Sequence, residues 1–291
     1  MDLVSNMTSI GKRYPFQFNY RAGVDSNGKL SAIEILFYVN QGAYFDTADG
    51  SVGAALFAID NVYSCPNWKV SGKICKTNIP PNTSTRGPGW VPAISCIEHI
   101  MQHLSLALSV PVDTLKQLNF YQKGSVTPFG QKLPDFPIET LWRQIQTQSN
   151  YAQRLEQVNQ YNSKNRWTKR GITLQPLRFG VYWAGVRFGA LVNVYGDGTV
   201  SISHGGIEIG QGINTKVAQA AAMVFAIALD KIKIYSSGTE TVANSNGTGG
   251  STTSELCVLA TIDACNQIKV PLFLKFDFSN CLIACGGKKT T

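Results

Sequence analysis

Long apolar runs, closely spaced cysteine pairs and a high content of charge are all missing from this 291-residue sequence. Only 15% of the residues are charged and 44% are hydrophobic, which excludes an intrinsically disordered chain, because disorder requires low hydrophobicity and high net charge. No run reaches the roughly 18 apolar residues that a membrane-spanning helix needs. The first twelve residues hold no apolar segment typical of a signal peptide, so we predict a cytoplasmic protein with no membrane partner.

The seven cysteines are odd in number and form no Cys-x-x-Cys pair. That pattern argues against a zinc ribbon and against a disulfide framework, and it fits reduced thiols in the cytosol. His99 and His103 have a spacing that can bind a metal on a helix, but no third ligand lies nearby, so we predict an exposed helix face. The sequence shows no Ser-His-Asp or Cys-His grouping, and we predict no catalytic residue and no metal ligand in this chain.

The formal net charge is +8, with a pI near 9.1. The lysines and arginines are dispersed, and their densest cluster, within residues 164–170, lies where a predicted helix ends. No nucleic-acid-binding motif accompanies the charge. We therefore predict a solvated helix face there and no nucleic-acid partner.

The first part of the chain mixes strand and helix patterns. Apolar and polar residues alternate on both sides of an Asn-Gly pair at 27–28, which predicts a β-hairpin. The predicted strands are residues 15–24, 30–44 and 68–76, and the predicted helices are 52–59, 90–108, one beginning at Pro111, and 139–163.

The pattern changes near Gly171, our predicted subdomain boundary. Beyond it we predict strands at 172–182, 187–195, 199–203 and 231–235, and helices at 213–228 and 251–268. Because the elements alternate without a strict βαβ rhythm, the predicted fold class is α+β, with mixed sheets and packed helices. Residues 269–291 form an atypical tail, for which we favour sequence foreign to the fold over a final strand.

Three glycine-bearing loops each precede a predicted helix, and such loops can hold an anion or a cofactor. Residues 82–89 include Arg86, whose planar guanidinium can grip an oxyanion; a turn with a surface arginine is the alternative. Residues 204–216 begin with four glycines in nine positions, and the amide of Gln211 can donate and accept beside a heterocycle; close packing is the alternative.

Residues 246–255 form the third loop, where capping of the helix by Ser251 with Ser254 or Glu255 is the alternative to ligand binding. Convergence of the three loops on one polyanionic cofactor is a hypothesis at this point.

At these loops the sequence resembles the molybdenum hydroxylases, the aldehyde oxidase and xanthine dehydrogenase family. Residues 13–16 (Arg-Tyr-Pro-Phe) are similar to the family's Arg-His-Pro-Phe segment, and residues 76–87 to the stretch that leads to its cofactor-binding arginine. Residues 204–212 closely match the signature His-Gly-Gly-x-Glu-x-Gly-Gln-Gly. The resemblance implies the first part of a molybdopterin-binding region at 13–170 and a partial second molybdopterin-binding subdomain at 171–268.

The resemblance also implies an oxidoreductase that hydroxylates a small-molecule aldehyde or N-heterocycle with water as the oxygen source. Its implied cofactor in this region is molybdenum-molybdopterin. The 2Fe-2S clusters and the FAD that carry electrons away in the full-length family have no binding motif here, and full-length relatives are homodimers. By motif match, the cofactor-binding residues are Arg86, Ile209, Gly210, Gln211, Gly250, Ser251 and Thr253.

The sequence departs from xanthine-specific members at the implied substrate pocket. Ala54 replaces a substrate-orienting arginine, Pro88 replaces a phenylalanine, and Trp183 replaces a second phenylalanine. A pocket without the arginine cannot fix a purine carbonyl in the same way, so we predict an aldehyde oxidase-like pocket of the insect type.

The family's catalytic glutamate, in a Gly-Glu-Pro-Pro segment, has no match in this chain, so we predict no turnover by the chain alone. A non-catalytic pterin-binding or anion-binding protein and a decayed gene product remain the alternatives.

Overall fold

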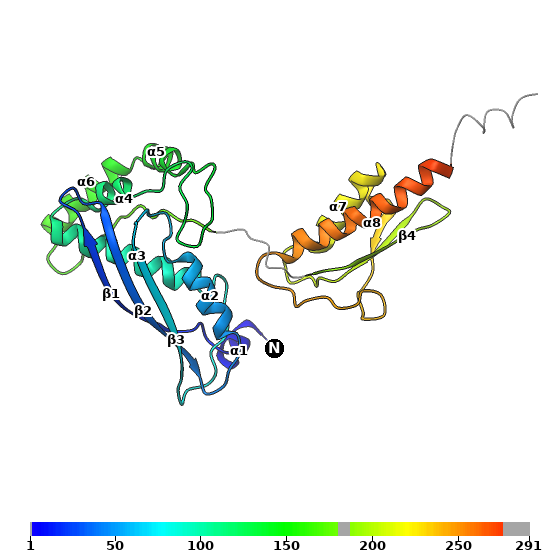
Figure 1. Ribbon diagram of the computed structural model, residues 1–291, viewed down its shortest axis with the longest axis horizontal. Coiled ribbons are helices and arrows are strands. Elements are labelled where there is room, and N and C mark those ends of the chain that lie inside the picture. The colour runs from blue at the N-terminus through cyan, green and yellow to red at the C-terminus, as the bar shows by residue number, and fades with distance from the viewer. Residues whose placement is uncertain (1, 180–186, 276–291) are drawn as a thin grey trace, which may run out of the picture. The chain divides into compact units, whose positions relative to one another are not determined.

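The computed structural model describes residues 2–179 and 187–275 (Figure 1). It divides the chain into two compact units, Met1–Gly180 (unit 1) and Val181–Thr291 (unit 2). The division falls after the predicted boundary at Gly171, because Ile172 and Leu174 still pack against the core of unit 1. The change at Gly171 is therefore a change of sequence pattern inside unit 1.

Unit 1 contains a three-stranded sheet in the order β1-β2-β3. Strands β1 (Phe16–Val24) and β2 (Leu30–Gly42) are antiparallel, and β3 (Trp68–Lys76) runs parallel to β2. The predicted hairpin is confirmed, and Gly28 at its tip has φ +86°, a left-handed conformation that glycine adopts without strain. Alternate residues of β2 are buried, so this sheet has one face in the core.

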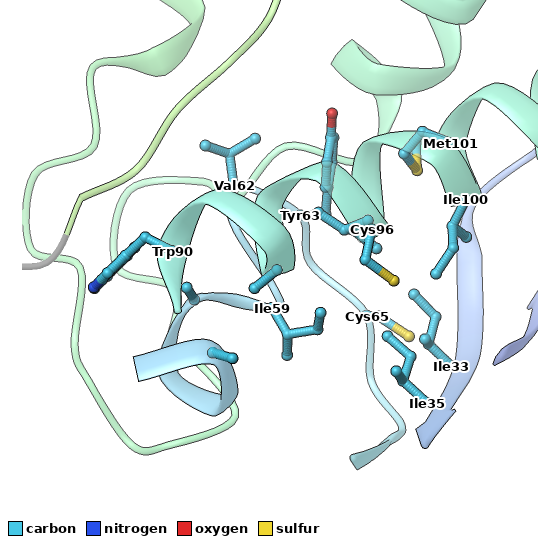
Figure 2. Packing of buried hydrophobic residues seen from close by; sticks show 14 of the residues in the cluster. Ile33, Ile35, Ile59, Val62, Tyr63, Cys65, Trp90, Cys96, Ile100 and Met101 are labelled. Atoms are coloured by element: carbon cyan, nitrogen blue, oxygen red, sulfur yellow. The ribbon is translucent and has the colours of Figure 1, made fainter. Parts of the chain in front are cut away.

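Helices pack against the buried face of this sheet (Figure 1). Figure 2 shows Ile33 and Ile35 of β2 beside Cys96 and Ile100 of the longest helix of unit 1, α3. The helices of unit 1 are α1 (Leu3–Ser9), α2 (Ala48–Ala58), α3 (Trp90–Leu108), α4 (Val112–Leu118), α5 (Ile138–Gln148) and α6 (Tyr151–Lys164).

The predicted helices differ from the structure in two respects. The single helix predicted at 139–163 is divided into α5 and α6, because Asn150 has the left-handed φ of 50° and interrupts the helical path. Helix α1 was not predicted, since it buries no residue and carries no amphipathic signal.

The strand predicted at 172–182 is wrong for its described part, 172–179, which is neither strand nor helix. Its alternate residues are buried, as in a strand, but its backbone bonds to buried side chains instead of a neighbouring strand. Lys116 Nζ donates to Leu174 O at 2.9 Å, and Asn61 Nδ2 donates to Pro176 O at 2.9 Å. We call residues 172–179 the strap.

Buried charges hold the strap against the rest of unit 1. The Arg178 guanidinium lies 2.5 Å from Asp60 Oδ1, and Lys116 Nζ lies 2.9 Å from Glu98 Oε2. Burial raises the pKa of Asp60 to about 6, against the opposing effects of Arg178 and the Tyr121 hydroxyl. Removal of one ion from such a buried pair leaves the other charge uncompensated and costs roughly 3–5 kcal/mol of folding stability. Each ion therefore stabilises its partner in the buried state.

Unit 2 has a second three-stranded sheet, in the order β4-β5-β6. Its strands are β4 (Ala190–Val194), β5 (Val200–His204) and β6 (Ile232–Ile234), with β4 antiparallel and β6 parallel to β5. Helices α7 (Ile213–Phe225) and α8 (Thr253–Lys275) each contribute apolar residues, among them Val217 and Cys257, to the core formed with this sheet. A short 3₁₀ turn, η1 (Leu229–Lys231), precedes β6. Mixed sheets with packed helices confirm the predicted α+β class.

Helix α8 corrects the predicted tail. The helix predicted at 251–268 continues to Lys275, so the first seven residues of the predicted tail are helical. Lys269 Nζ donates to Val224 O at 2.9 Å, which joins this stretch to α7. Residues 276–291 lie outside the described residues. Within residues 2–179 and 187–275, no helix is both long and apolar enough to cross a membrane.

Candidate ligand-binding loops

The glycine-rich loop 205–212 joins β5 to α7, and its first two glycines are packed. A Cβ at Gly205 would lie 1.9 Å from Ser245 Oγ. A Cβ at Gly206 would lie 2.6 Å from Ile213 Cδ1 and 2.8 Å from Thr253 Cγ2. The packing interpretation is therefore correct for these two positions.

The other two glycines of this loop are open. Gly210 and Gly212 have φ of +100° and +73°, and no atom lies within 4 Å of a Cβ built on either. The space beside both α-carbons is therefore open to a ligand, although the two N–H groups are bonded to Glu208 Oε1. Ile209 beside them is 66% exposed, so the loop presents an accessible rim.

The third loop, residues 246–253, lies against the second. Ile207 N donates to Thr248 Oγ1 at 2.9 Å, and Gly206 packs on Thr253. Gly250 and Ser251 both have left-handed φ values, +67° and +61°, immediately before α8 begins. Two of the three predicted loops thus meet within unit 2, and the first lies in unit 1.

Capping at α8 differs from the predicted arrangement. Among the described residues, the Thr253 hydroxyl bonds the loop, accepting from Gly249 N at 3.2 Å and donating to Gly249 O at 3.3 Å. No described hydrogen bond links the Ser251 side chain to Ser254 or Glu255. Thr253 therefore closes the turn that leads into α8.

Two side chains of the 205–212 loop bond within the loop. Glu208 Oε1 accepts from Gly210 N and Gly212 N, each at 2.9 Å, and the Gly212 N–H is the main cause that lowers the Glu208 pKa. Gln211 Oε1 accepts from Ile209 N at 2.7 Å, while its Nε2 donates to Ile207 O at 2.9 Å. The side chain of Gln211 thus bonds the loop backbone.

A buried histidine lies behind this loop and bonds an exposed asparagine. His204 Nε2 and Asn214 Oδ1 are 2.9 Å apart, so the imidazole of His204, which is 2% exposed, links β5 to the first turn of α7. Its Nδ1 has no hydrogen-bond partner among the described residues, and neither has the buried Ser245 Oγ. The sequence analysis included His204 only as part of the motif at 204–212, and it did not name Ser245.

The loop that carries Arg86 is fixed by its neighbours in unit 1. The Arg13 guanidinium donates to Arg86 O at 2.9 Å and to Gly87 O at 3.3 Å. Asn82 Nδ2 donates to Asn40 O at 2.9 Å at the end of β2. The Arg86 side chain itself is exposed, just before α3 begins.

Two of the three predicted substrate-pocket residues lie together. A Cβ at Gly89 would be 2.7 Å from Ala54 Cβ, which places Ala54 of α2 beside Gly89 and next to Pro88. Trp183 lies outside the described residues. The strap adds Phe179, which the sequence analysis did not name. The centroid of its ring lies 4.6 Å from the ring centroid of Trp90 at the start of α3.

The histidines on α3 have other partners. His99 Nδ1 is 2.7 Å from Ser95 O, and the His103 ring stacks on Tyr20 and bonds its hydroxyl. No cluster of three metal-ligating side chains occurs within the described ranges.

The fold and the paired loops define an α+β protein that presents open backbone to a ligand at a helix start. Two family models, each described as a molybdopterin cofactor-binding domain, match residues 1–120 and 144–274. A rice (Oryza sativa subsp. japonica) xanthine dehydrogenase is 39% identical over 272 residues, which are 92% of this chain and 20% of that protein. A xanthine dehydrogenase of Calliphora vicina is 38% identical with the same coverage.

A CO dehydrogenase from Oligotropha carboxidovorans shares the fold, with a TM-score of 0.73 at 19% identity over 88% of this chain and 34% of that chain. The chain belongs to the molybdenum hydroxylase family, whose members are molybdenum-dependent oxidoreductases. It spans about a fifth of the length of the curated relatives that it matches.

Proposed function

We propose that the loops 205–212 and 246–253 bind the molybdenum-molybdopterin cofactor of an oxidoreductase that hydroxylates an aldehyde or an N-heterocycle. The bond between Ile207 N and Thr248 Oγ1 carries this proposal, because it joins the two loops at one place in unit 2. The cofactor-binding match of both family models supports it.

The open backbone of these loops fits such a group. Gly210 and Gly250 have no heavy atom closer than 4.0 Å to a built Cβ, so a pterin edge or a phosphate can reach the main chain. N–H groups at a helix start attract phosphate, and at α8 they act against the Glu255 carboxylate of the first turn. Ile209, Gly210 and Gln211 would contact the cofactor from one loop.

The residues Gly250, Ser251 and Thr253 would contact it from the other loop. Because the Gln211 amide already bonds Ile207 and Ile209, we propose that Gln211 acts mainly through its backbone. Within unit 1, Arg86 is proposed as an oxyanion ligand in its own right, because Arg13 fixes its carbonyl and its exposed guanidinium remains available for an oxyanion.

When bound, molybdenum-molybdopterin supplies two-electron oxidation and an oxygen atom derived from water. The chain's own residues hold and orient this group. No residue of the chain is proposed as the general base, since the glutamate segment of the family has no match here. We therefore propose that the chain alone does not turn over, and that 2Fe-2S and FAD bind elsewhere in longer relatives.

For the substrate we propose an aldehyde oxidase-like preference. Ala54 and Pro88 beside Gly89 offer small apolar surfaces and no guanidinium that could orient a purine carbonyl. The curated relatives reported above are named xanthine dehydrogenases, so xanthine is the competing substrate. Oxidation of xanthine by a longer form of the protein would contradict the proposed preference for aldehydes.

We also propose that the protein is cytoplasmic and that its longer form is a homodimer. The five cysteines of the described residues are free thiols, which favours a reducing compartment.

Metal analysis and fluorescence of the oxidised pterin test the binding proposal on the purified chain. Gly250→Ala forces a side chain into a left-handed conformation and should reduce molybdenum and pterin content several-fold, or about 1 kcal/mol of binding. Gly247→Ala is the matched control, because Gly247 has open space and no left-handed φ. Absence of both components from a soluble, folded wild-type sample would contradict binding by this chain.

The same samples test the proposed lack of turnover. A chain that retains pterin but does not oxidise aldehydes fits a non-catalytic binding protein as well as the proposed role. Aldehyde oxidation by the purified chain would refute the proposed lack of turnover.

A further inference from the structure

The strap carries a buried arginine that fills a socket of oxygen atoms in unit 1. Arg178 is 9% exposed, and its guanidinium donates to Asn61 O, Asp60 Oδ1, Gln131 Oε1 and Phe57 O. These acceptors come from the end of α2, from the turn that follows it and from the loop before α5. A planar guanidinium fork can serve such a divided set of acceptors, whereas one ammonium group cannot reach all of them together.

Asn61 fixes the strap on both sides of an exposed leucine. Its Nδ2 donates to Pro176 O at 2.9 Å, and its Oδ1 accepts from Arg178 N at 3.0 Å. Asn61 is fully buried, while Leu177, which lies between the two contacts, is 64% exposed. The path of the strap is therefore set by Asn61 and Arg178 and not by the side chain of Leu177.

The next residue carries a ring that reaches the substrate-pocket region. Phe179 is 56% exposed, and its ring centroid lies 4.6 Å from that of Trp90, with an angle of 32° between the ring planes. Trp90 begins α3 directly after Gly89, which packs on Ala54. The Trp90 indole points away from the isoleucines of β2 (Figure 2), and the Phe179 ring covers part of it.

We propose that Arg178 is a positioning residue whose guanidinium fork holds the Phe179 ring on Trp90 as an aromatic wall of the substrate-pocket region. The Phe179 ring is more than half exposed, whereas Arg178 before it is buried and makes five hydrogen bonds to unit 1. The anchor of the ring is therefore the preceding residue.

The proposed wall fits the flat face of an aromatic aldehyde. Aromatic rings attract one another in offset or tilted arrangements, and the wall adjoins the small apolar surfaces of Ala54 and Pro88. This inference rests on the proposed function, in which Ala54 and Pro88 line the substrate pocket. It adds Phe179 and Trp90 as the surface that contacts the substrate, and Arg178 as the residue that sets its geometry.

The first test measures the position of the Phe179 ring in the full chain labelled with 5-fluorotryptophan. The fluorine NMR signal of Trp90, one of five tryptophans, is assigned with Trp90→Phe. Phe179→Leu removes the ring and should displace the Trp90 signal. Arg178→Lys keeps a positive charge for Asp60 but loses the fork, so it should displace the signal in the same direction by at least half as much.

Two controls separate the position of the ring from the stability of the fold. Leu177→Ala changes an exposed side chain of the strap next to Arg178 and should leave the Trp90 signal unchanged. If Arg178→Lys does not fold, Arg178→Met combined with Asp60→Asn removes the guanidinium without leaving a buried charge. That double variant is compared with Asp60→Asn alone, and only the double variant should displace the Trp90 signal as Phe179→Leu does.

The second test is a titration with benzamide, a stable planar carbonyl compound that takes the place of an aromatic aldehyde. In the wild type, benzamide should shift the Trp90 signal until the site is saturated. The Kd for benzamide should rise several-fold in Phe179→Leu and in Arg178→Lys, and it should stay unchanged in Leu177→Ala.

Each outcome decides one part of the inference. A Trp90 signal that moves in Phe179→Leu but stays in place when the guanidinium is removed refutes the positioning role of Arg178. A wild-type Trp90 signal that does not respond to benzamide refutes the aromatic wall as a substrate surface. Neither result depends on molybdenum or pterin content, so failure of the proposed cofactor binding is recognised separately.

Discussion

The contact between Gly89 and α2 permits a quantitative prediction about the substrate-pocket region. Gly89 has φ −94° and ψ −25°, an ordinary helical conformation that alanine adopts freely. A Cβ there would lie 2.3 Å from Ala55 N and 2.3 Å from Ser51 O, both of which are backbone atoms of α2. Since backbone within a helix cannot rotate away, Gly89→Ala must separate α2 from α3.

The magnitude follows from two opposing contributions. Overpacking of a tight contact costs about 1–3 kcal/mol, and two backbone clashes favour the upper end. Alanine also restricts the unfolded chain more than glycine does, which stabilises the folded state by about 0.4–1 kcal/mol. The expected net loss is therefore about 2 kcal/mol in the free energy of unfolding, or about 1 M in the urea midpoint at a slope of about 2 kcal/mol per M.

Gly53→Ala is the matched control on the same helix. No atom lies within 4 Å of a Cβ at Gly53, so alanine should stabilise α2 by up to about 1 kcal/mol. Urea unfolding followed by tryptophan fluorescence measures both variants, since four of the five tryptophans lie in unit 1. A Gly89→Ala midpoint equal to or above that of the wild type would refute the packing argument.

Two further predictions concern the buried charges of unit 1. Lys116→Met leaves Glu98 without its cation and should lower the free energy of unfolding by about 3–5 kcal/mol, whereas adding Glu98→Gln should restore part of the loss in a double-mutant cycle. Because burial raises the pKa of Asp60 from 3.8 to about 6, the native state binds the proton more tightly than the unfolded state does. The free energy of unfolding should therefore fall by up to about 3 kcal/mol as pH rises from about 4 to about 6, and Asp60→Asn should remove that decrease in pH-dependent urea unfolding.

Local signals in the sequence were sufficient for much of the fold. The Asn-Gly turn before Lys29 predicted the β1-β2 hairpin, and apolar spacing predicted α3 with its observed bounds. Both signals act between residues close in sequence, where turn chemistry and side-chain periodicity dominate. The glycine-rich motif at 204–212 also sufficed to predict the family.

Longer elements depended on tertiary contacts. The alternation at 172–179 predicted a strand, yet Lys116, Asn61 and Asp60 bind this segment as a strap. The end of α8 was missed although Lys269, just beyond the predicted end, bonds Val224 O of α7, a contact that no local pattern records. In both cases, groups far apart in sequence supply the hydrogen bonds that decide the conformation.

The candidate site shows the same division. The sequence by itself determined which loops carry glycine and which residue types, including Arg86 and Gln211, can bind an anion or a heterocycle. Only the tertiary structure decided that Gly206 packs on Thr253 while Gly210 is open. A motif fixes chemical groups along the chain, whereas the space around each glycine and the partner of each charge depend on which distant segments the fold brings together.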